Sequence, residues 1–235
     1  MWSYYGRKTK VVQYYPSPKY GKIIEPFAGT GVYSLYEDNW KKDILLIDKY
    51  DVVIKVWHYL QQATKEDIMS LPDMQYHDNV DIHTQLSEEE KWLIGFCING
   101  GSAQPKKTTM KFNTWNRTKP WIADNVHKIK HWVIRQDDFH NLANEEATWF
   151  IDPPYQVGGI YYRHSNKFID FKELAEWCKS RNGQVIVCEN TKADWLDFIP
   201  MKRMKGALHT TTEAIWTNDM IKLPIIEELD EFWLR

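Results

Sequence analysis

Two short apolar segments near the N-terminus, each running into a polar turn, constrain the fold of this chain more than any other feature. Lys22–Pro26 and Ile44–Ile47 have the length and composition of buried strands. The first runs into a glycine-rich turn, after which we expect a helix over Val32–Asn39. The second ends at an aspartate, and Asp51–Ala63 then carries apolar residues at helical spacing. Strand, turn and helix twice in succession predict a parallel, doubly wound sheet, an α/β fold of the Rossmann-like type.

The middle of the chain loses this rhythm and recovers it later. We therefore predict one domain made of residues 1–63 and 124–235, with residues 64–123 as an insertion that contains a helix at Glu88–Cys97. After the insertion, the pattern predicts the following elements: strands at His131–Gln136, Ala147–Ile151 and Gln184–Cys188, a helix at Asp170–Ser180, and a closing hairpin of Met201–Lys205 with Glu213–Thr217.

Composition excludes several classes of protein. The chain has 235 residues, 43% of them apolar, which is enough for one substantial core. Its three cysteines are neither paired nor close together, and His127 and His131 lack a third ligand, so we expect no disulfide framework and no metal site. There is no apolar leader and no run of about 20 apolar residues, so we expect a soluble, cytoplasmic protein without a membrane partner.

The glycine-rich turn is the first candidate binding feature. In Phe27-Ala28-Gly29-Thr30-Gly31, the glycines would let the backbone approach a ligand closely. Asp48 closes the second strand, where a carboxylate could accept hydrogen bonds from both hydroxyls of a ribose. The alternative is that the glycines merely turn the chain and Asp48 caps the next helix. The residues themselves favour neither interpretation.

The second candidate feature is Asp152-Pro153-Pro154-Tyr155, directly after the apolar strand Thr148–Ile151. The two prolines stiffen the turn, so the Asp152 carboxylate and the Pro153 carbonyl can be held as paired acceptors. Two acceptors suit the two hydrogens of an aromatic amine, and Tyr155 could stack on the base. The alternative is a rigid turn with Tyr155 as ordinary packing. We favour the functional interpretation, because a charge after a buried strand is costly unless it is used.

These two segments, in this order, resemble motifs I and IV of the amino-methyltransferases, in particular the Dam-like alpha group of N6-adenine DNA methyltransferases. Further matches extend over most of the chain. Tyr4-Tyr5-Gly6-Arg7-Lys8 resembles the N-terminal motif X, Asp48 the ribose-binding acid, and Asp138-Phe139 the motif that contacts the cofactor adenine, with Asp137 as the alternative acid. The resemblance implies a cofactor site for S-adenosylmethionine built from Tyr4, Lys8, Pro26, Phe27, Ala28, Gly29, Gly31, Asp48, Asp138, Phe139 and Asp152.

The resemblance also implies a reaction. A flipped adenine would be held by the catalytic residues Asp152, Pro153, Pro154 and Tyr155 while its N6 amine takes a methyl group directly from S-adenosylmethionine. One alternative is an N6-adenine methyltransferase that acts on RNA or single strands. Another is an inactive DNA-binding regulator that keeps the same fold.

Charge is segregated along the chain although the net charge is only −2. Between Lys91 and Ala123 there are six Lys or Arg residues and no Asp or Glu. We therefore expect the insertion to be the target-recognition region that meets DNA, which is duplex by the resemblance. The expected DNA contacts are Lys106, Lys107, Lys111, Asn113, Trp115, Arg117 and Lys119.

Overall fold

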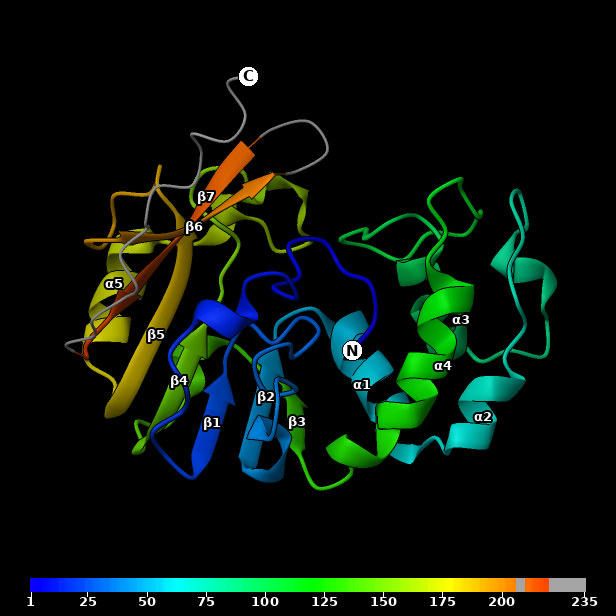
Figure 1. The fold of residues 1–235 in the computed structure, drawn as a ribbon, viewed down its shortest axis with the longest axis horizontal. Helices are drawn as coiled ribbons and strands as arrows, with labels where there is room; N and C mark the ends of the chain where they lie inside the picture. Colours follow the sequence, from blue (N-terminus) through cyan, green and yellow to red (C-terminus); the bar gives the residue numbers. More distant parts are fainter. Residues whose placement is uncertain (206–209, 220–235) are drawn as a thin grey trace, which may run out of the picture.

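The computed structural model describes residues 1–205 and 210–219, and these form a single seven-stranded sheet with helices around it (Figure 1). The strand order is β3-β2-β1-β4-β5-β7-β6. The strands are β1 (Lys22–Glu25), β2 (Asp43–Asp48), β3 (Val133–Gln136), β4 (Ala147–Ile151), β5 (Gly183–Asn190), β6 (Ile199–Lys205) and β7 (Thr210–Thr217).

The direction of the strands identifies the fold. β1 to β5 pair in parallel, whereas β7 runs antiparallel to β5 and β6 antiparallel to β7. A doubly wound parallel sheet closed by an antiparallel hairpin, with this strand order, is the Rossmann-like methyltransferase fold. The predicted fold class and the predicted closing hairpin are confirmed.

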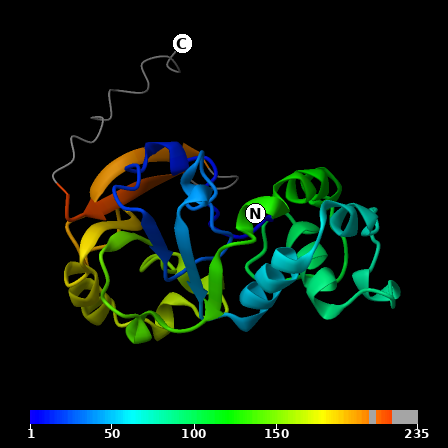
Figure 2. The same cartoon turned by 90° about the horizontal axis from the view of Figure 1, so that it is seen from below.

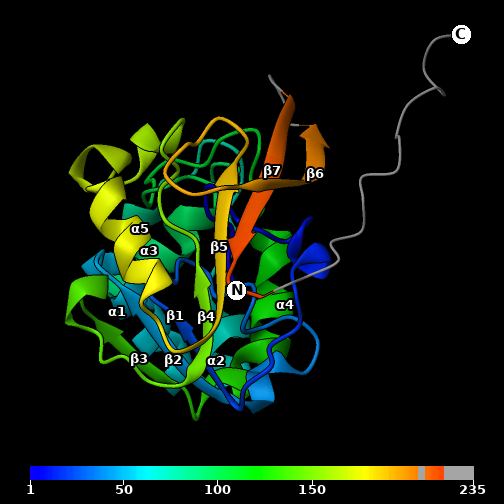
Figure 3. The same ribbon diagram turned by 90° about the vertical axis from the view of Figure 1, so that its left-hand side faces the viewer.

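Helices cover both faces of the sheet. Successive strand residues point to opposite faces, so Ile44 and Leu46 pack in the cluster that contains α1 (Asp51–Gln62), while Leu45 and Ile47 pack with α5 (Phe171–Lys179). Figure 3 shows α5 against β5. Both helices lie where the spacing of apolar residues predicts them.

The helix expected over Val32–Asn39 is wrong, because this segment is a series of turns that ends in the short 3₁₀ helix η2. The Asn39 amide donates to the Tyr33 carbonyl at 2.9 Å, the group that would accept from the Glu37 N–H in a helix. Glu37 also has a positive φ of 48°, which an α-helix does not tolerate.

Residues 64–123 contribute most of a helical region on one flank of the sheet, next to α1 (Figures 1 and 2). It contains α2 (Lys65–Ser70), α3 (Glu88–Cys97) and α4 (Trp115–Asn125). The predicted helix Glu88–Cys97 is confirmed, and Ser87 with Glu90 forms a capping box at its start. Seven short 3₁₀ helices complete the described chain: η1 (Val12–Tyr14), η2 (Asn39–Lys41), η3 (Val80–Ile82), η4 (Val126–Ile129), η5 (Phe139–Asn141), η6 (Gly159–Tyr161) and η7 (Asn166–Phe168). Within the described residues, every helix is too short or too polar to cross a membrane.

Candidate active site

A cavity lies at the carboxyl ends of β1, β2 and β4, where the strand order reverses direction between β1 and β4. Ligands of open α/β sheets bind at this switch point. Three carboxylates from three strand ends, Glu25, Asp48 and Asp152, line the cavity, and the N-terminal segment Tyr4–Lys8 contributes to the same wall. Among the predicted cofactor residues, the cavity is lined by Tyr4, Lys8, Pro26, Phe27, Ala28, Gly29, Gly31, Asp48, Asp138, Phe139 and Asp152.

The turn after β1 depends on glycine. Gly29 and Gly31 have φ values of +46° and +56°, in the left-handed region that favours glycine. A Cβ at Gly31 would also lie 3.1 Å from the Trp57 ring. Trp57 on α1 donates its indole N–H to the Gly29 carbonyl at 2.9 Å. Packing by Trp57 therefore supports this turn, whose residues line the cavity.

Asp48 ties the two turns together. One carboxylate oxygen accepts from the Gly29 N–H at 3.0 Å and the other from the Tyr50 N–H at 2.9 Å. Burial raises the pKa of Asp48 to about 6, although the two backbone N–H groups oppose this rise. Because each carboxylate oxygen can accept a second hydrogen bond, Asp48 can support the turn and still bind a hydroxyl in the cavity.

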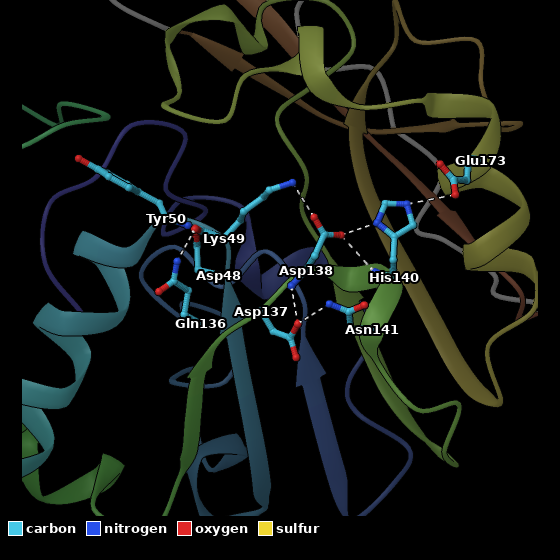
Figure 4. A network of polar contacts seen from close by, with 9 residues as sticks. All are labelled: Asp48, Lys49, Tyr50, Gln136, Asp137, Asp138, His140, Asn141 and Glu173. Carbon is cyan, nitrogen blue, oxygen red and sulfur yellow. Dashed lines mark hydrogen bonds and ion pairs between the residues drawn. The ribbon is translucent and has the colours of Figure 1, made fainter.

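Figure 4 shows the acids that follow β3. The Asp138 carboxylate accepts from Lys49 Nζ at 2.7 Å and contacts the His140 ring at 2.5 Å, and His140 in turn lies 3.2 Å from Glu173. Burial would raise the pKa of Asp138, but the bonds from Lys49 and His140 outweigh burial and lower it. Asp137 instead accepts from the Asp138 N–H and from the Asn141 amide. Both acids line the cavity. That Asp138, rather than Asp137, contacts the cofactor adenine stays a prediction.

Aromatic rings form the walls beside these acids. Phe27 and Phe139 face each other with centroids 5.6 Å apart, and the far side of Phe139 packs on Trp177 of α5. Tyr4 lies against the glycine turn, since a Cβ on Gly29 would sit 3.5 Å from its ring. The cavity thus has flat apolar walls at the end that carries Asp138.

The Asp152 end of the cavity holds a buried ion pair. Lys8 Nζ lies 3.0 Å from Asp152 Oδ1 and donates to the Tyr155 hydroxyl at 2.5 Å. Burial would lower the pKa of Lys8, but Asp152 and Glu213 outweigh burial and raise it, so Lys8 is an ammonium. Burial raises the pKa of Asp152 to about 6 against the opposing effect of Lys8. Lys8, expected from its motif to contact a cofactor, therefore points at the catalytic motif as well.

The remaining residues of that motif lie behind Asp152. Pro154 lines the cavity, Pro153 is buried, and Tyr155 is half-buried with its hydroxyl directed away toward β7. There the hydroxyl donates to Glu213 Oε1, which also accepts from the Tyr15 hydroxyl at 2.6 Å. No motif predicted Glu213 or Tyr15, because their approach to Tyr155 depends on the antiparallel return of β7 beside β5.

Two of the predicted DNA contacts, Trp115 and Lys119, are wrong because both side chains are buried. Trp115 is fully buried and donates its indole N–H to the Pro72 carbonyl at 2.8 Å. Lys119 is buried as well and binds the Leu71 carbonyl and Asp73. Neither side chain is available to stack on a base or meet a phosphate, because both hold α4 against the segment after α2.

The remaining predicted DNA contacts differ in their exposure to solvent. Asn113 is half-buried and donates its amide to the Met74 carbonyl at 2.8 Å. Lys107 is exposed but lies 2.6 Å from Asp81. Lys106, Lys111 and Arg117 are exposed, and so is Phe112, at 73%. Fewer basic side chains are therefore available on the surface of this region than the number of basic residues in its sequence suggests.

Within residues 1–205 and 210–219, we find no group of three side chains that could hold a metal ion.

Comparison with known proteins adds little. No family model and no curated protein matches the chain. Among solved structures, a conserved hypothetical protein from Streptococcus pyogenes matches at 9% identity and a TM-score of 0.34, covering 86% of this chain and 88% of that one. A candidate methyltransferase, yhhF from Escherichia coli, matches at 9% identity and a TM-score of 0.31, covering 88% and 78%. Matches with TM-scores this low do not identify a fold, so the fold is assigned from the order and direction of the strands.

Proposed function

We propose that this chain transfers a methyl group from S-adenosylmethionine to the exocyclic N6 of adenine in DNA. One observation carries the proposal: the Asp152 carboxylate opens into the same cavity as Asp48 and the glycine turn. An acceptor for an aromatic amine thus shares one cavity with the groups suited to a nucleoside cofactor. A turn that merely ended β4 would not need a buried charge there.

The residues of the cavity fit the cofactor. The Gly29–Gly31 turn lines the cavity with backbone in a left-handed conformation that favours glycine, and Asp48 offers acceptors for a ribose. Phe27 and Phe139 offer flat walls for a purine, with Asp138 or Asp137 beside them as the acceptor for its amine. When bound, S-adenosylmethionine supplies an electrophilic methyl group on a sulfonium centre.

The motif after β4 would hold the target amine. The Asp152 carboxylate would accept a hydrogen bond from one N–H of the N6 amine, and the Pro153 carbonyl would accept one from the other N–H. The Tyr155 ring would stack on the base. These acceptors reduce the conjugation of the nitrogen lone pair with the ring, and they direct that lone pair at the methyl group. The bound cofactor would supply the methyl group and keep the electrons of the broken S–C bond as a thioether, and the Asp152 carboxylate would accept the proton that the methylated amine releases.

We further propose that the helical region contributed by residues 64–123 engages the DNA. Three exposed cationic side chains, Lys106, Lys111 and Arg117, support this role, together with the exposed ring of Phe112. Phosphate contacts from such groups would position a duplex without reading its sequence.

The proposal is tested with purified protein and tritiated S-adenosylmethionine, by comparing duplex DNA, single-stranded DNA and RNA. We expect label on N6 of adenine in duplex DNA, and none with the Asp152→Ala variant. Transfer restricted to RNA or single strands would replace the DNA proposal with the second substrate class. DNA binding without any transfer would identify an inactive regulator. Sequencing of modified bases in DNA from cells that express the chain gives an independent check.

A further inference from the structure

Glu213 on β7 is a buried carboxylate at the centre of the contacts behind the catalytic motif. Its Oε1 accepts from the Tyr155 and Tyr15 hydroxyls and lies 3.4 Å from Lys8 Nζ. A carboxylate removed from water is costly unless charges and donors compensate it. Glu213 has three such partners, and two of them belong to the candidate active site.

Lys8 is shared between the two acids. Its ammonium has three hydrogens, and three acceptors surround it: Asp152 Oδ1 at 3.0 Å, the Tyr155 hydroxyl at 2.5 Å and Glu213 Oε1 at 3.4 Å. The hydroxyl of Tyr155 is fixed from two sides, because it accepts from Lys8 and donates to Glu213. One acid 58 residues further along the chain thus controls both the ring and the cation.

We propose that Glu213 is a positioning residue for the methyl transfer: it anchors the Tyr155 hydroxyl and divides the charge of Lys8 between itself and Asp152. This inference rests on the proposed function of the Asp152 site. One ammonium faces two carboxylates, so Asp152 is only partly neutralised and remains a strong acceptor for the amine. Without the charge of Glu213, Lys8 would pair with Asp152 alone and weaken it as an acceptor.

The other groups around Asp152 do not share this arrangement. The charged or acidic side chains that face it are Lys8, Glu25, Glu189 and Glu213. The neutral titratable groups beside it are Tyr15, Tyr155, Tyr162 and Cys188. Glu25 binds the Ser34 N–H, and Glu189 binds the Gln156 N–H at 2.5 Å and the Trp195 indole at 3.2 Å. Among the acids facing Asp152 in the described chain, only Glu213 contacts Lys8 or Tyr155.

The charge is tested with Glu213→Gln, which keeps a carbonyl acceptor for the two hydroxyls and removes the negative charge. Burial raises the pKa of Asp152, Lys8 opposes this rise and Glu213 adds to it. Loss of the Glu213 charge should therefore lower the Asp152 pKa. The measurement is carbon-13 NMR of labelled aspartate carboxyl groups, with Asp152→Asn to identify the resonance.

Glu189→Gln is the matched control, because it also removes one carboxylate that faces Asp152 but touches neither Lys8 nor Tyr155. We expect a smaller shift in this variant. An unmoved Asp152 pKa in Glu213→Gln, or an equal shift in both variants, would overturn the division of charge. This titration needs no substrate. Absence of transfer by the wild type therefore overturns the proposed function, whereas an unmoved titration overturns the inference.

The anchoring is tested with a double-mutant cycle of Glu213→Ala and Tyr155→Phe. Each change should lower kcat, by roughly tenfold, with cofactor affinity unchanged, because each releases the same ring. The double variant should lose less than the product of the two losses. Multiplicative losses would show that Glu213 does not act through Tyr155. If these variants do not fold, Glu213→Asp keeps the charge and withdraws the acceptor by one methylene, and an unchanged kcat in that variant would overturn the anchoring.

Discussion

The two ends of the molecule use their charged residues in different ways. At the strand ends, Asp48 and Asp152 are half-buried: two backbone N–H groups hold the Asp48 carboxylate and Lys8 holds that of Asp152. Glu213, within β7, is buried and has three partners. In the helical region, the basic residues at positions 106 to 119 range from exposed to buried, and Lys119 is buried. Buried acids with assigned partners characterise the first region, and an irregular cationic surface characterises the second.

The charges of the two regions differ in how well the sequence predicts their positions. An acid directly after a buried parallel strand must lie at the carboxyl end of the sheet, so the preceding apolar residues predict its position. A lysine in an irregular helical segment can face solvent or pack inward with its charge paired. For such residues, the count of charges overestimates the available surface.

The largest effect is expected from Asp152→Ala, which tests whether the strand-end acids are functional. Removal of the acceptor for the amine should lower methyl transfer by roughly 10³-fold or more. Cofactor binding by calorimetry and the far-ultraviolet circular dichroism spectrum should be retained. Asp197→Ala, at an exposed aspartate beyond β5, is the matched control and should keep full activity. Near-normal turnover of Asp152→Ala would remove the catalytic assignment.

Trp115→Ala tests whether Trp115, in the helical region, is a buried packing residue and not a DNA contact. Because the ring is fully buried, the variant should lose about 3–5 kcal/mol of unfolding free energy in urea denaturation. Trp121→Ala on the same helix is the control, since that ring is 49% exposed and should cost far less. Similar losses for both would contradict the burial of Trp115 and restore it as a DNA contact.

Asp48→Ala tests whether Asp48 or Asp51 is the acid that binds the ribose. Loss of hydrogen bonds to a charged acceptor should weaken S-adenosylmethionine binding by about 1.5–3 kcal/mol in calorimetry. Asp51→Ala, at the exposed start of α1 and paired with Lys55, should leave the affinity unchanged. If Asp51→Ala weakened binding and Asp48→Ala did not, the ribose acid would be Asp51.

The pH dependence of cofactor binding follows from the same carboxylate. Burial raises the pKa of Asp48 to about 6, and the ionised form is the acceptor for hydroxyl groups. Affinity should therefore be full above pH 6 and decline as the pH falls through about 6. Calorimetric titrations between pH 5 and pH 8 measure this, and Asp48→Asn should abolish the decline. A decline that persists in Asp48→Asn would assign the titration to another group.

The smallest effect is expected at the cationic surface. Each phosphate contact contributes about 0.9 to the logarithmic salt slope of duplex binding. Lys106→Gln with Lys111→Gln should thus lower the slope by about 1.8, with cofactor affinity unchanged, whereas Lys107→Gln should change it less, because Lys107 is paired with Asp81. Lys119→Gln should leave the slope of the folded protein unchanged. An unaltered slope in the double variant would place the DNA surface elsewhere.

Much of the framework was accessible from the sequence. The periodicity of apolar residues predicted the strands, the helices α1, α3 and α5, and the closing hairpin, because burial of one face requires that pattern in any fold. The glycine turn, Asp48 and Asp152 were accessible too, since each directly follows a strand. The helix expected at Val32–Asn39 is wrong because Glu37 has a positive φ and Asn39 binds the Tyr33 carbonyl, and the spacing of apolar residues reveals neither.

Local spacing in the sequence therefore specifies which segments form the sheet and which acids stand at its carboxyl edge. The partners of those acids depend on tertiary contacts. The antiparallel return of β7 brings Glu213 to Tyr155, and the N-terminal segment brings Lys8 to Asp152. The same holds for Lys119 and Trp115, whose burial depends on the packing of α4. Contacts between distant segments depend on the path of the whole chain, and no local pattern carries that information.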